Sequence, residues 1–299
     1  MRLADITARG AVTHAYRPDI FAGKLVVSYC NVPFLERLPS ICAVGRPRTL
    51  VWLNCMTWTS APEIECHKLG LIDLFGFQSR YQRSMLLPHL QTVRPVKELE
   101  GYRPFFDLER WSKGLPAPAS APDECGYYGL GRVSRDDGSK YPADLWPTFR
   151  RVTAPRPVKC FVLGWGYNAR RKCGPPQAHR DLDWMVWGPG AVPAHELYRR
   201  VHTLMHQTGG SRENWPRIAF EAWASGVALL AERDYAWPEL VADGDTGILC
   251  GSSEEFARRA SELAFDESKR RGIVQAARAH LLSEHCNAGR SLAAWGDLL

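Results

Sequence analysis

Short apolar runs alternate along the chain with segments whose apolar residues recur at helical spacing. In the first 115 residues, such runs predict strands at 24–30, 48–54 and 71–77, with a fourth near 10–15. Helical spacing predicts helices near 61–69 and 79–90. Because strands that alternate with helices form parallel sheets, this part of the chain predicts a small α/β domain with a short sheet.

The same alternation is clearer in the second half of the chain. The predicted strands are 126–133, 158–164, 183–188, 203–207, 227–232 and 247–250. The predicted helices are 142–151, 193–201, 216–225, 236–242, 253–265 and 267–284. Ser252 and Glu255 have the spacing of a capping box, which predicts a helix start at 253–254. Strands and helices in this order predict a complete doubly wound domain.

One aperiodic stretch rich in Pro and Ala, 113–122, predicts a linker between the two halves. We therefore expect an N-terminal domain at 1–115, a C-terminal domain at 124–285, and a last segment, 286–299, that packs back on the N-terminal domain. Two α/β domains of this kind leave a cleft between them, which is the usual place for a ligand.

Composition narrows the class of protein. The chain has 299 residues, 45% of them hydrophobic and 23% charged, which is typical of a globular protein. The net charge of +6 suits anionic ligands such as nucleotide diphosphates, but it is too small to require a nucleic acid. The sequence contains no apolar stretch of membrane-spanning length and no secretory signal pattern, so we expect a cytoplasmic protein.

The nine cysteines are scattered and show no Cys-x-x-Cys spacing. An odd number without paired spacing predicts reduced thiols, in keeping with the cytoplasm. The adjacent pairs Cys66–His67 and His285–Cys286 are poorly spaced as zinc ligands, so we expect no metal site.

The stretch 209–226 has the pattern of a ligand-binding helix start. Pro216 is predicted as the first helical residue and Gly226 as the residue just past the helix. Ahead of Pro216, Gly209 and Gly210 allow a main chain to approach a ligand closely. The free N–H groups and the positive end of the helix dipole then favour an anion or a hydroxyl group.

Two glutamates, Glu213 and Glu221, flank this helix start. Their spacing alone is uninformative, because Glu254 and Glu262 repeat it on an ordinary amphipathic helix. Glu221 lies among apolar neighbours, and a carboxylate there needs hydrogen-bond donors. A ribose diol supplies them, and an ion pair with Arg217, one turn earlier, is the alternative.

These segments resemble retaining family-4 glycosyltransferases, which have the GT-B fold of two Rossmann-like parallel-sheet domains. The similarity is carried by 213–226 (ENWPRIAFEAWASG), by 239–247 (ELVADGDTG), by the Gly-Arg…Lys element at 131–140 and by the strand and glycine turn at 162–166. It covers about 125–285. The N-terminal domain is reduced in comparison with the family.

The resemblance implies transfer of a sugar from a nucleoside-diphosphate sugar to an acceptor hydroxyl, with retention, and without a metal or other cofactor. It implies that Arg132 and Lys140, helped by Arg135, neutralise the diphosphate, and that Glu213 faces the transferred sugar. Glu221 then binds the ribose. The further donor contacts that it implies are Asn214, Trp215, Pro216, Arg217, Gly164, Gly190 and Val192, the last two near the base.

The N-terminal domain departs from the family pattern, because the histidine expected to face the sugar is missing. His14 and His67 are candidates to replace it. The departure favours an alternative function, a nucleotide-sugar-binding protein without catalysis or a subunit that needs a partner, and it also suggests an oligomer. A third hypothesis gives the transferase a modified base in DNA as its acceptor.

Overall fold

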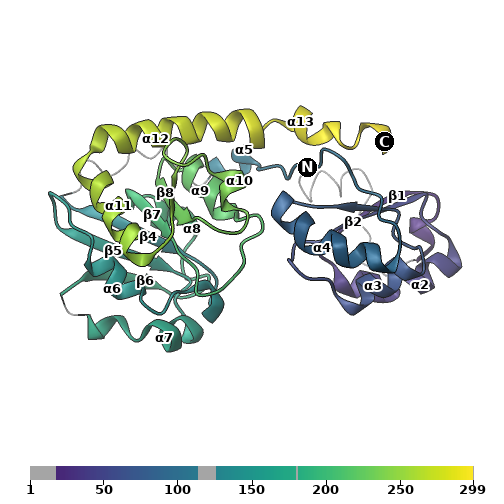
Figure 1. Cartoon of the computed structure of the whole chain (residues 1–299), viewed down its shortest axis with the longest axis horizontal. Helices are drawn as coiled ribbons and strands as arrows, with labels where there is room; N and C mark the ends of the chain where they lie inside the picture. The colour runs from purple at the N-terminus through teal and green to yellow at the C-terminus, as the bar shows by residue number, and fades with distance from the viewer. Residues whose placement is uncertain (1–17, 114–125, 180, 299) are drawn as a thin grey trace. The chain divides into compact units, whose positions relative to one another are not determined.

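The computed structural model describes residues 18–113, 126–179 and 181–298 (Figure 1). The chain divides into two compact units. The first holds the described residues up to Gln78, then Gln82–Tyr102, and the segment from Ala293. The second holds Ser79–Tyr81 and Arg103–Leu292. The strand predicted near 10–15, and all but the first residue of the predicted linker, lie outside the described residues.

The first unit is built around a parallel sheet with the strand order β1-β2-β3. Its strands are β1 (Leu25–Tyr29), β2 (Thr49–Leu53) and β3 (Leu74–Gly76). Its helices are η1 (Pro18–Phe21), α2 (Val32–Val44), α3 (Ala61–Lys68), α4 (Arg80–Val93) and η5 (Gly296–Leu298). The three predicted strands are confirmed, although β3 is shorter than the apolar run that predicted it. Almost the whole of β2 is buried, as expected for a strand covered on both faces.

Helix α2 was missed by the sequence pattern for a physical reason. It contains Pro39 in its interior, a residue that normally ends a helix because it lacks an N–H group. Its start is nevertheless well formed, since the Asn31 side chain accepts a hydrogen bond from the N–H of Phe34. Leu35, Leu38 and Ile41 then bury one face of the helix.

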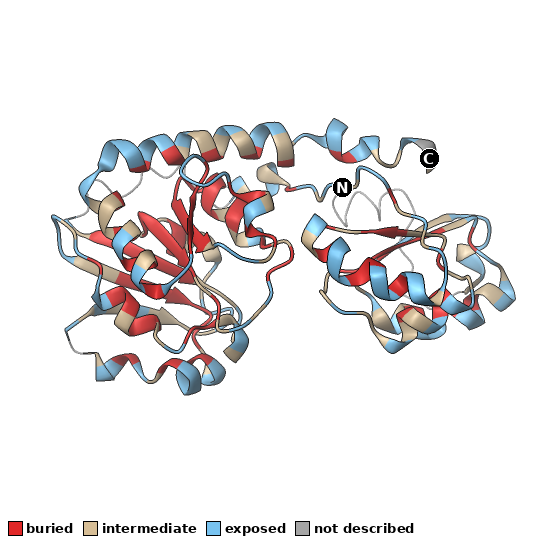
Figure 2. Ribbon diagram, in the orientation of Figure 1, coloured by how far each residue is buried: buried red, intermediate tan, exposed pale blue. Residues whose placement is uncertain are grey.

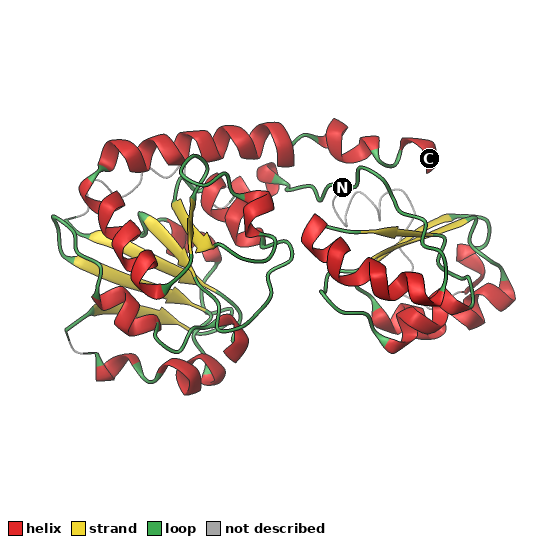
Figure 3. Cartoon of the chain, in the orientation of Figure 1, coloured by secondary structure: helices red, strands yellow, loops and turns green. Residues whose placement is uncertain are grey.

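The second unit is a doubly wound domain with helices on both faces of a six-stranded parallel sheet (Figure 3). Its strands are β4 (Tyr128–Val133), β5 (Val158–Leu163), β6 (Asp183–Trp187), β7 (Thr203–His206), β8 (Ala228–Glu232) and β9 (Ile248–Cys250). All six predicted strands are confirmed. The order is β6-β5-β4-β7-β8-β9, in which the chain starts at the centre and winds outward in both directions.

The helical segments of this unit follow the predicted alternation, with additions. They are α5 (Leu108–Ser112), η2 (Gly138–Lys140), α6 (Leu145–Arg150), α7 (Tyr167–Cys173), η3 (Pro176–Ala178), α8 (Ala194–Tyr198), α9 (Arg217–Ala224), α10 (Trp237–Leu240), α11 (Ser253–Phe265), α12 (Glu267–His280), η4 (Leu281–His285) and α13 (Ala288–Ala293). Helix α7 was not predicted. The Asp136 carboxylate accepts hydrogen bonds from the N–H groups of Asn168 and Ala169 at its start, a long-range cap that local pattern does not reveal.

Alternate residues of the central strands supply two separate cores. Ala228 and Leu230 of β8 pack with α6, α7 and α11, whereas Leu229 and Ala231 pack with α8, α9, α10 and α12. This period of two is what a strand buried between two helical layers requires. Figure 2 shows the buried residues concentrated along this sheet and on the helix faces that cover it.

The end of the chain packs on the sheet of the first unit. Trp295 contacts Tyr102 edge to face, and its neighbours Ala294 and Leu298 cover Val51 and Leu53. Arg48 donates a hydrogen bond to the carbonyl oxygen of Leu298 at 2.6 Å. These contacts bury the outer face of β2 beneath the last turn of the chain.

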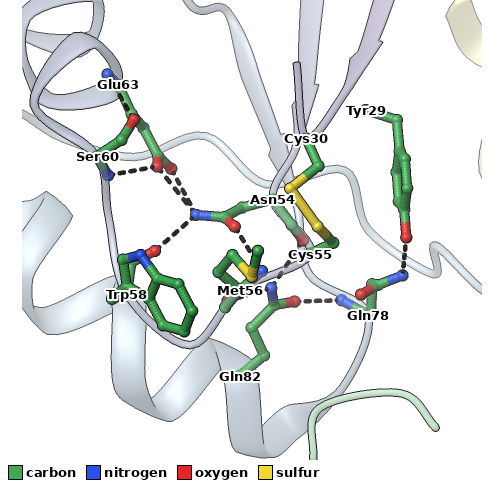
Figure 4. The surroundings of a disulfide bond; sticks show 10 residues. All are labelled: Tyr29, Cys30, Asn54, Cys55, Met56, Trp58, Ser60, Glu63, Gln78 and Gln82. Atoms are coloured by element: carbon green, nitrogen blue, oxygen red, sulfur yellow. Dashed lines mark hydrogen bonds between the residues drawn. A yellow bond between two sulfur atoms is a disulfide. The ribbon is translucent and has the colours of Figure 1, made fainter. Parts of the chain in front are cut away.

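The cysteines correct one expectation. Cys30, just after β1, and Cys55, just after β2, form a disulfide, so the prediction that all thiols are reduced is wrong for this pair (Figure 4). A sequence separation of 25 gave no sign of it, since the pairing depends on two strands that lie side by side. The other described cysteines are free: Cys42, Cys66, Cys160, Cys173, Cys250 and Cys286.

None of the helices in the described ranges is both long and apolar enough to cross a membrane.

Candidate functional site

The predicted site residues lie at the point in the sheet of the second unit where the winding of the chain reverses. Strands β4 and β7 are neighbours at its centre, but the chain leaves β4 toward β5 and leaves β7 toward β8. The loops after the two strands therefore diverge at their carboxyl ends, which is where open α/β sheets bind ligands. Lys140 lies on the first loop and Glu213 on the second.

Close main-chain approach joins these two loops. The N–H groups of Gly209 and Ser211 both donate to the carbonyl oxygen of Ser139, at 2.8 and 3.0 Å. A Cβ on Gly209 would lie 1.9 Å from the carbonyl oxygen of Tyr141, so only glycine fits there. Gly209 was expected to admit a ligand, but it instead admits the neighbouring loop.

Lys140 and Glu213 form an ion pair in this switch region. The distance from Lys140 Nζ to Glu213 Oε1 is 2.7 Å, and the side chains are only 16% and 10% exposed. His206, the last residue of β7, lies on the same oxygen, with Nε2 at 3.3 Å. Glu213 thus has two partners, one from the loop after β4 and one from the end of strand β7.

The charge states of these groups follow from burial and from their partners. Burial acts to raise the pKa of Glu213, but the contacts with His206 and Lys140 outweigh it and lower the pKa to about 2. The pKa of His206 falls to about 4, because burial and the nearby Arg132 both disfavour its charged form. At neutral pH His206 is therefore neutral, and the Lys140 ammonium is the cation that pairs with Glu213. The ionised carboxylate only accepts, so His206 donates from Nε2.

Arg132 is fully buried beneath this pair. Its guanidinium donates to the main-chain carbonyl oxygens of Lys140 and, at 3.4 Å, Met205. Burial lowers its pKa, against the attraction of Tyr141 and of the carboxylates of Glu213 and Glu232. The side chain predicted to contact a diphosphate is bonded here to the backbone of the loop that carries Lys140 and to the backbone of strand β7.

The hydrogen-bond partner of Glu221, on α9, is Tyr198. It is not Arg217, the alternative to a ribose diol in the sequence analysis. The Tyr198 hydroxyl donates to Glu221 Oε2 at 3.2 Å. Burial raises the pKa of Glu221, whereas the charge of Arg217 and the Tyr198 hydrogen bond lower it. Arg217 itself is exposed at the first position of the helix.

The start of α9 differs slightly from its prediction. Pro216 is the cap residue and the helix begins at Arg217, with no side chain capping its first N–H groups. Asn214 is buried, and its side-chain oxygen accepts a hydrogen bond from Ser79, which belongs to the same unit, at 2.7 Å. Trp215 packs against Phe220 of α9.

The remaining predicted donor contacts lie on loops at the same carboxyl edge. Arg135 is exposed on the loop after β4. Gly164 follows β5 with a φ of 89°, and a Cβ there would meet the carbonyl oxygen of Ser134 at 1.6 Å. Gly190 and Val192 follow β6, where Gly190 has open space around it. The assignments of these residues to a donor remain predictions.

Three polar residues of this edge were missed in the sequence: His206, Tyr198 and Glu232. Glu232 ends β8, and its carboxylate accepts from the N–H and the hydroxyl of Thr208, at 2.8 to 3.0 Å. His206 ends β7 in the same way. The sequence signal of His206 and Glu232 was their place as the last residue of a buried parallel strand, whereas Tyr198 ends helix α8 and had no such signal.

His67, one of the two candidates to replace the missing histidine, is part of the core of the first unit. It is 2% exposed, and Nε2 lies 3.2 and 3.1 Å from the carbonyl oxygens of Leu90 and Arg94. Its ring packs edge to face on Phe75. His14 lies outside the described residues.

No group of three or more His, Cys, Asp and Glu side chains is placed to hold a metal within the described ranges. Two Asp-x-Asp sequences do occur, at 181–183 and 243–245. Arg150 pairs with Asp181 at 2.7 Å, Lys159 with Asp183 at 3.1 Å and Arg233 with Asp243 at 2.8 Å. These carboxylates are engaged by cations of the protein itself.

Comparison with known proteins agrees with this architecture. Residues 180–294 match a family model described as "Glycosyl transferase-like". The curated proteins contain no match to the sequence. Among solved structures, HepE from Anabaena in complex with UDP and glucose is similar, with a TM-score of 0.66 and 15% identity over 91% of this chain and 77% of HepE.

Two further structures cover 92% of this chain and 72% of their own, each with 14% identity. They are sucrose-phosphate synthase from Thermosynechococcus elongatus, with a TM-score of 0.66, and a UDP-forming α,α-trehalose-phosphate synthase from Burkholderia xenovorans, with 0.67. The fold is thus that of GT-B glycosyltransferases, as predicted, and the three-stranded sheet makes the N-terminal part the smaller one. The residues similar to the glycosyl transferase-like family model all lie in the C-terminal part.

Proposed function

We propose that the protein is a glycosyltransferase that moves a sugar from a nucleoside-diphosphate sugar to an acceptor hydroxyl with retention. The observation that carries the proposal is the Lys140–Glu213 pair at the switch point of the sheet, beside the uncapped start of α9. A diphosphate needs a cation and free N–H groups, and an activated sugar needs a carboxylate that stabilises positive charge at its anomeric carbon. The chain supplies all three at one edge.

In this proposal the ion pair belongs to the donor-free protein. The donor diphosphate takes over the Lys140 ammonium, and Glu213, already ionised, turns to the transferred sugar. Arg132 acts as a positioning residue, because its bonds to the carbonyl oxygens of Lys140 and Met205 hold the loop that carries Lys140 against strand β7. Glu221 and Tyr198 receive the ribose hydroxyls, and no metal is required.

The first donor to test is UDP-glucose, because HepE has been solved with it and UDP recurs among the similar structures. Purified protein is incubated with UDP-glucose and then with other nucleoside-diphosphate sugars, and release of the nucleoside diphosphate is measured. Slow release without an acceptor supports the proposal. Donor binding without release supports instead the alternative of a binding protein or of a subunit that needs a partner.

The variant Glu213→Gln tests the assigned carboxylate. Turnover is expected to fall by about 10²-fold or more, since stabilisation of this kind is worth roughly 2.7–4 kcal/mol. Glu254→Gln is the matched control, because Glu254 is exposed on α11 and belongs to the second glutamate pair of identical spacing. Turnover within about twofold of wild type in Glu213→Gln would remove Glu213 from the reaction.

A further inference from the structure

The carboxyl edge of the first sheet carries a covalent link that the proposed function does not use. Cys30 and Cys55 follow the neighbouring strands β1 and β2, with their Cα atoms 5.6 Å apart. Both residues are only half-buried, so a small thiol in solution can reach the bond. Figure 4 shows that Cys55 lies within the loop that runs from Asn54 to Ser60, ahead of α3.

Hydrogen bonds through two amide side chains fix the opposite side of this loop. Gln82 Nε2 donates to the carbonyl oxygens of Asn54 and Met56, at 2.7 and 2.8 Å, on either side of Cys55. Asn54 accepts from the N–H of Met56 at 2.7 Å and donates to the carbonyl oxygen of Trp58 at 3.1 Å. The disulfide holds the same residues toward β1. The loop therefore has one covalent and one hydrogen-bonded anchor.

A buried acid locks the second anchor. Both carboxylate oxygens of Glu63 accept from Asn54 Nδ2, at 3.2 and 2.9 Å, and Glu63 also forms the capping box of α3 with Ser60. Trp58, at the outer end of the loop, is 61% exposed. The order of the loop thus decides how a large aromatic side chain is presented to solvent.

The backbone of Cys30 favours release when the bond opens. Cys30 has a φ of 47°, a left-handed conformation that residues with a Cβ rarely adopt. Its N–H donates to the carbonyl oxygen of Leu53 at 2.9 Å, which together with the disulfide holds it there. Once the sulfur link is broken, one of the restraints that oppose relaxation toward ordinary backbone angles is lost.

We propose that Cys30–Cys55 is a reversible thiol–disulfide exchange site that takes low-molecular-weight dithiols, and that reduction leaves the loop from Asn54 to Ser60 held by its hydrogen-bonded anchor alone. One dithiol molecule supplies two electrons and two protons. Its sulfurs close into a cyclic disulfide while the Cys30–Cys55 bond opens to two thiols. The inference rests on the first unit alone and is independent of the proposed function.

The other described cysteines are poor competitors for this exchange. Burial raises the pKa of Cys66 and of Cys173 to about 11 and the pKa of Cys250 to about 12, which keeps these thiols protonated and unreactive. Cys42 is the matched control, since it is a half-buried free cysteine of the same unit.

The test compares the full chain before and after treatment with dithiothreitol, by alkylation with peptide mapping and by hydrogen exchange. Reduction is expected to expose two new thiols, at Cys30 and Cys55, and to speed exchange of the Met56 N–H by about tenfold or more. The N–H groups within β2 are expected to stay within about twofold, and the oxidised cyclic form of the reagent is expected to reverse the change.

Cysteine variants test whether the response to reduction depends on Cys30 and Cys55 and not on another thiol. Cys42→Ser is expected to respond as the wild type does, and the double variant Cys30→Ser/Cys55→Ser to exchange at the reduced rate under both conditions. The proposal is overturned if Cys30 and Cys55 alkylate before reduction, or if they open only when the unit unfolds. It is also overturned if Met56 exchange stays unchanged, or if β2 loses protection together with the loop.

Discussion

Replacing Lys140 by methionine tests the electrostatics of the switch region directly. The substitution removes the ammonium group and keeps an apolar side chain of similar length. Glu213 then keeps only neutral His206 as a hydrogen-bond partner, in a setting where both side chains of the former pair were at most 16% exposed. Burial, which raises the pKa of Glu213, is then opposed by the contact with His206 and no longer by Lys140.

The magnitude follows from the pKa of Glu213. Its fall from 4.5 to about 2 corresponds to about 3 kcal/mol at roughly 1.4 kcal/mol per pKa unit. The contacts with His206 account for part of this lowering, and the charge and hydrogen bond of Lys140 account for the rest. Lys140→Met is therefore expected to lower the free energy of unfolding by about 1–2 kcal/mol at neutral pH, which is a fraction of that total.

The loss of stability in Lys140→Met is expected to depend on pH. A carboxylate whose pKa is lowered in the folded protein stabilises fully above its unfolded pKa, and that stability is lost as the pH falls through the folded value. The difference between wild type and Lys140→Met should thus be full above pH 4.5 and shrink toward pH 2. Urea unfolding at a series of pH values measures it.

The control is Lys159→Met, which breaks an ion pair with Asp183 whose side chains are 32% and 59% exposed. Exposed pairs are worth at most about 1 kcal/mol, so little change is expected there. If Lys140→Met costs no more than this control, or if its cost is the same at every pH, Lys140 does not hold Glu213 ionised and the electrostatic account of the site is wrong.

Two further predictions concern the same edge. His206→Gln should flatten the fall in stability between pH 6.5 and about 4, because the pKa of His206 is lowered in the folded protein and its stabilisation is lost as the pH drops through that window; an unchanged profile by urea unfolding would contradict this. Gly164→Ala should lower the free energy of unfolding by about 3 kcal/mol or more, since its Cβ would overlap the Ser134 carbonyl oxygen. Gly190→Ala, also at positive φ but in open space, should cost only about 1 kcal/mol, and equal losses would refute the packing argument.

Much of the second unit was predictable because local pattern and global fold agree there. Its six strands are short apolar runs between helices, and a doubly wound order places the ends of β4 and β7 together. The resemblance then pointed to Lys140 and Glu213. That these two charges pair, and that Arg132 lies beneath them, depends on side-chain packing that no spacing encodes.

The first unit was predicted less well, because its helix α2 and its disulfide depend on contacts between residues that are distant in the sequence. Pro39 argues locally against helix α2, yet the tertiary packing of Leu35, Leu38 and Ile41 overrides it. The Cys30–Cys55 bond joins residues brought together only by the parallel pairing of β1 and β2. In both cases the deciding contacts are distant in sequence, so local pattern carries no trace of them.

The state of the Lys140–Glu213 pair bears on how a donor would bind. A mostly buried ion pair stabilises little in net terms, because desolvation offsets most of the attraction, but it holds two opposite charges ready at 2.7 Å. In the proposed function, a donor diphosphate that takes over Lys140 supplies a replacement anion, so the ammonium is never left unpaired. Glu213 loses its cation at the same moment and needs a new one. The developing positive charge of a sugar at its anomeric carbon meets that need, which makes exchange of partners a physical reason for Glu213 to favour the transition state over the bound donor.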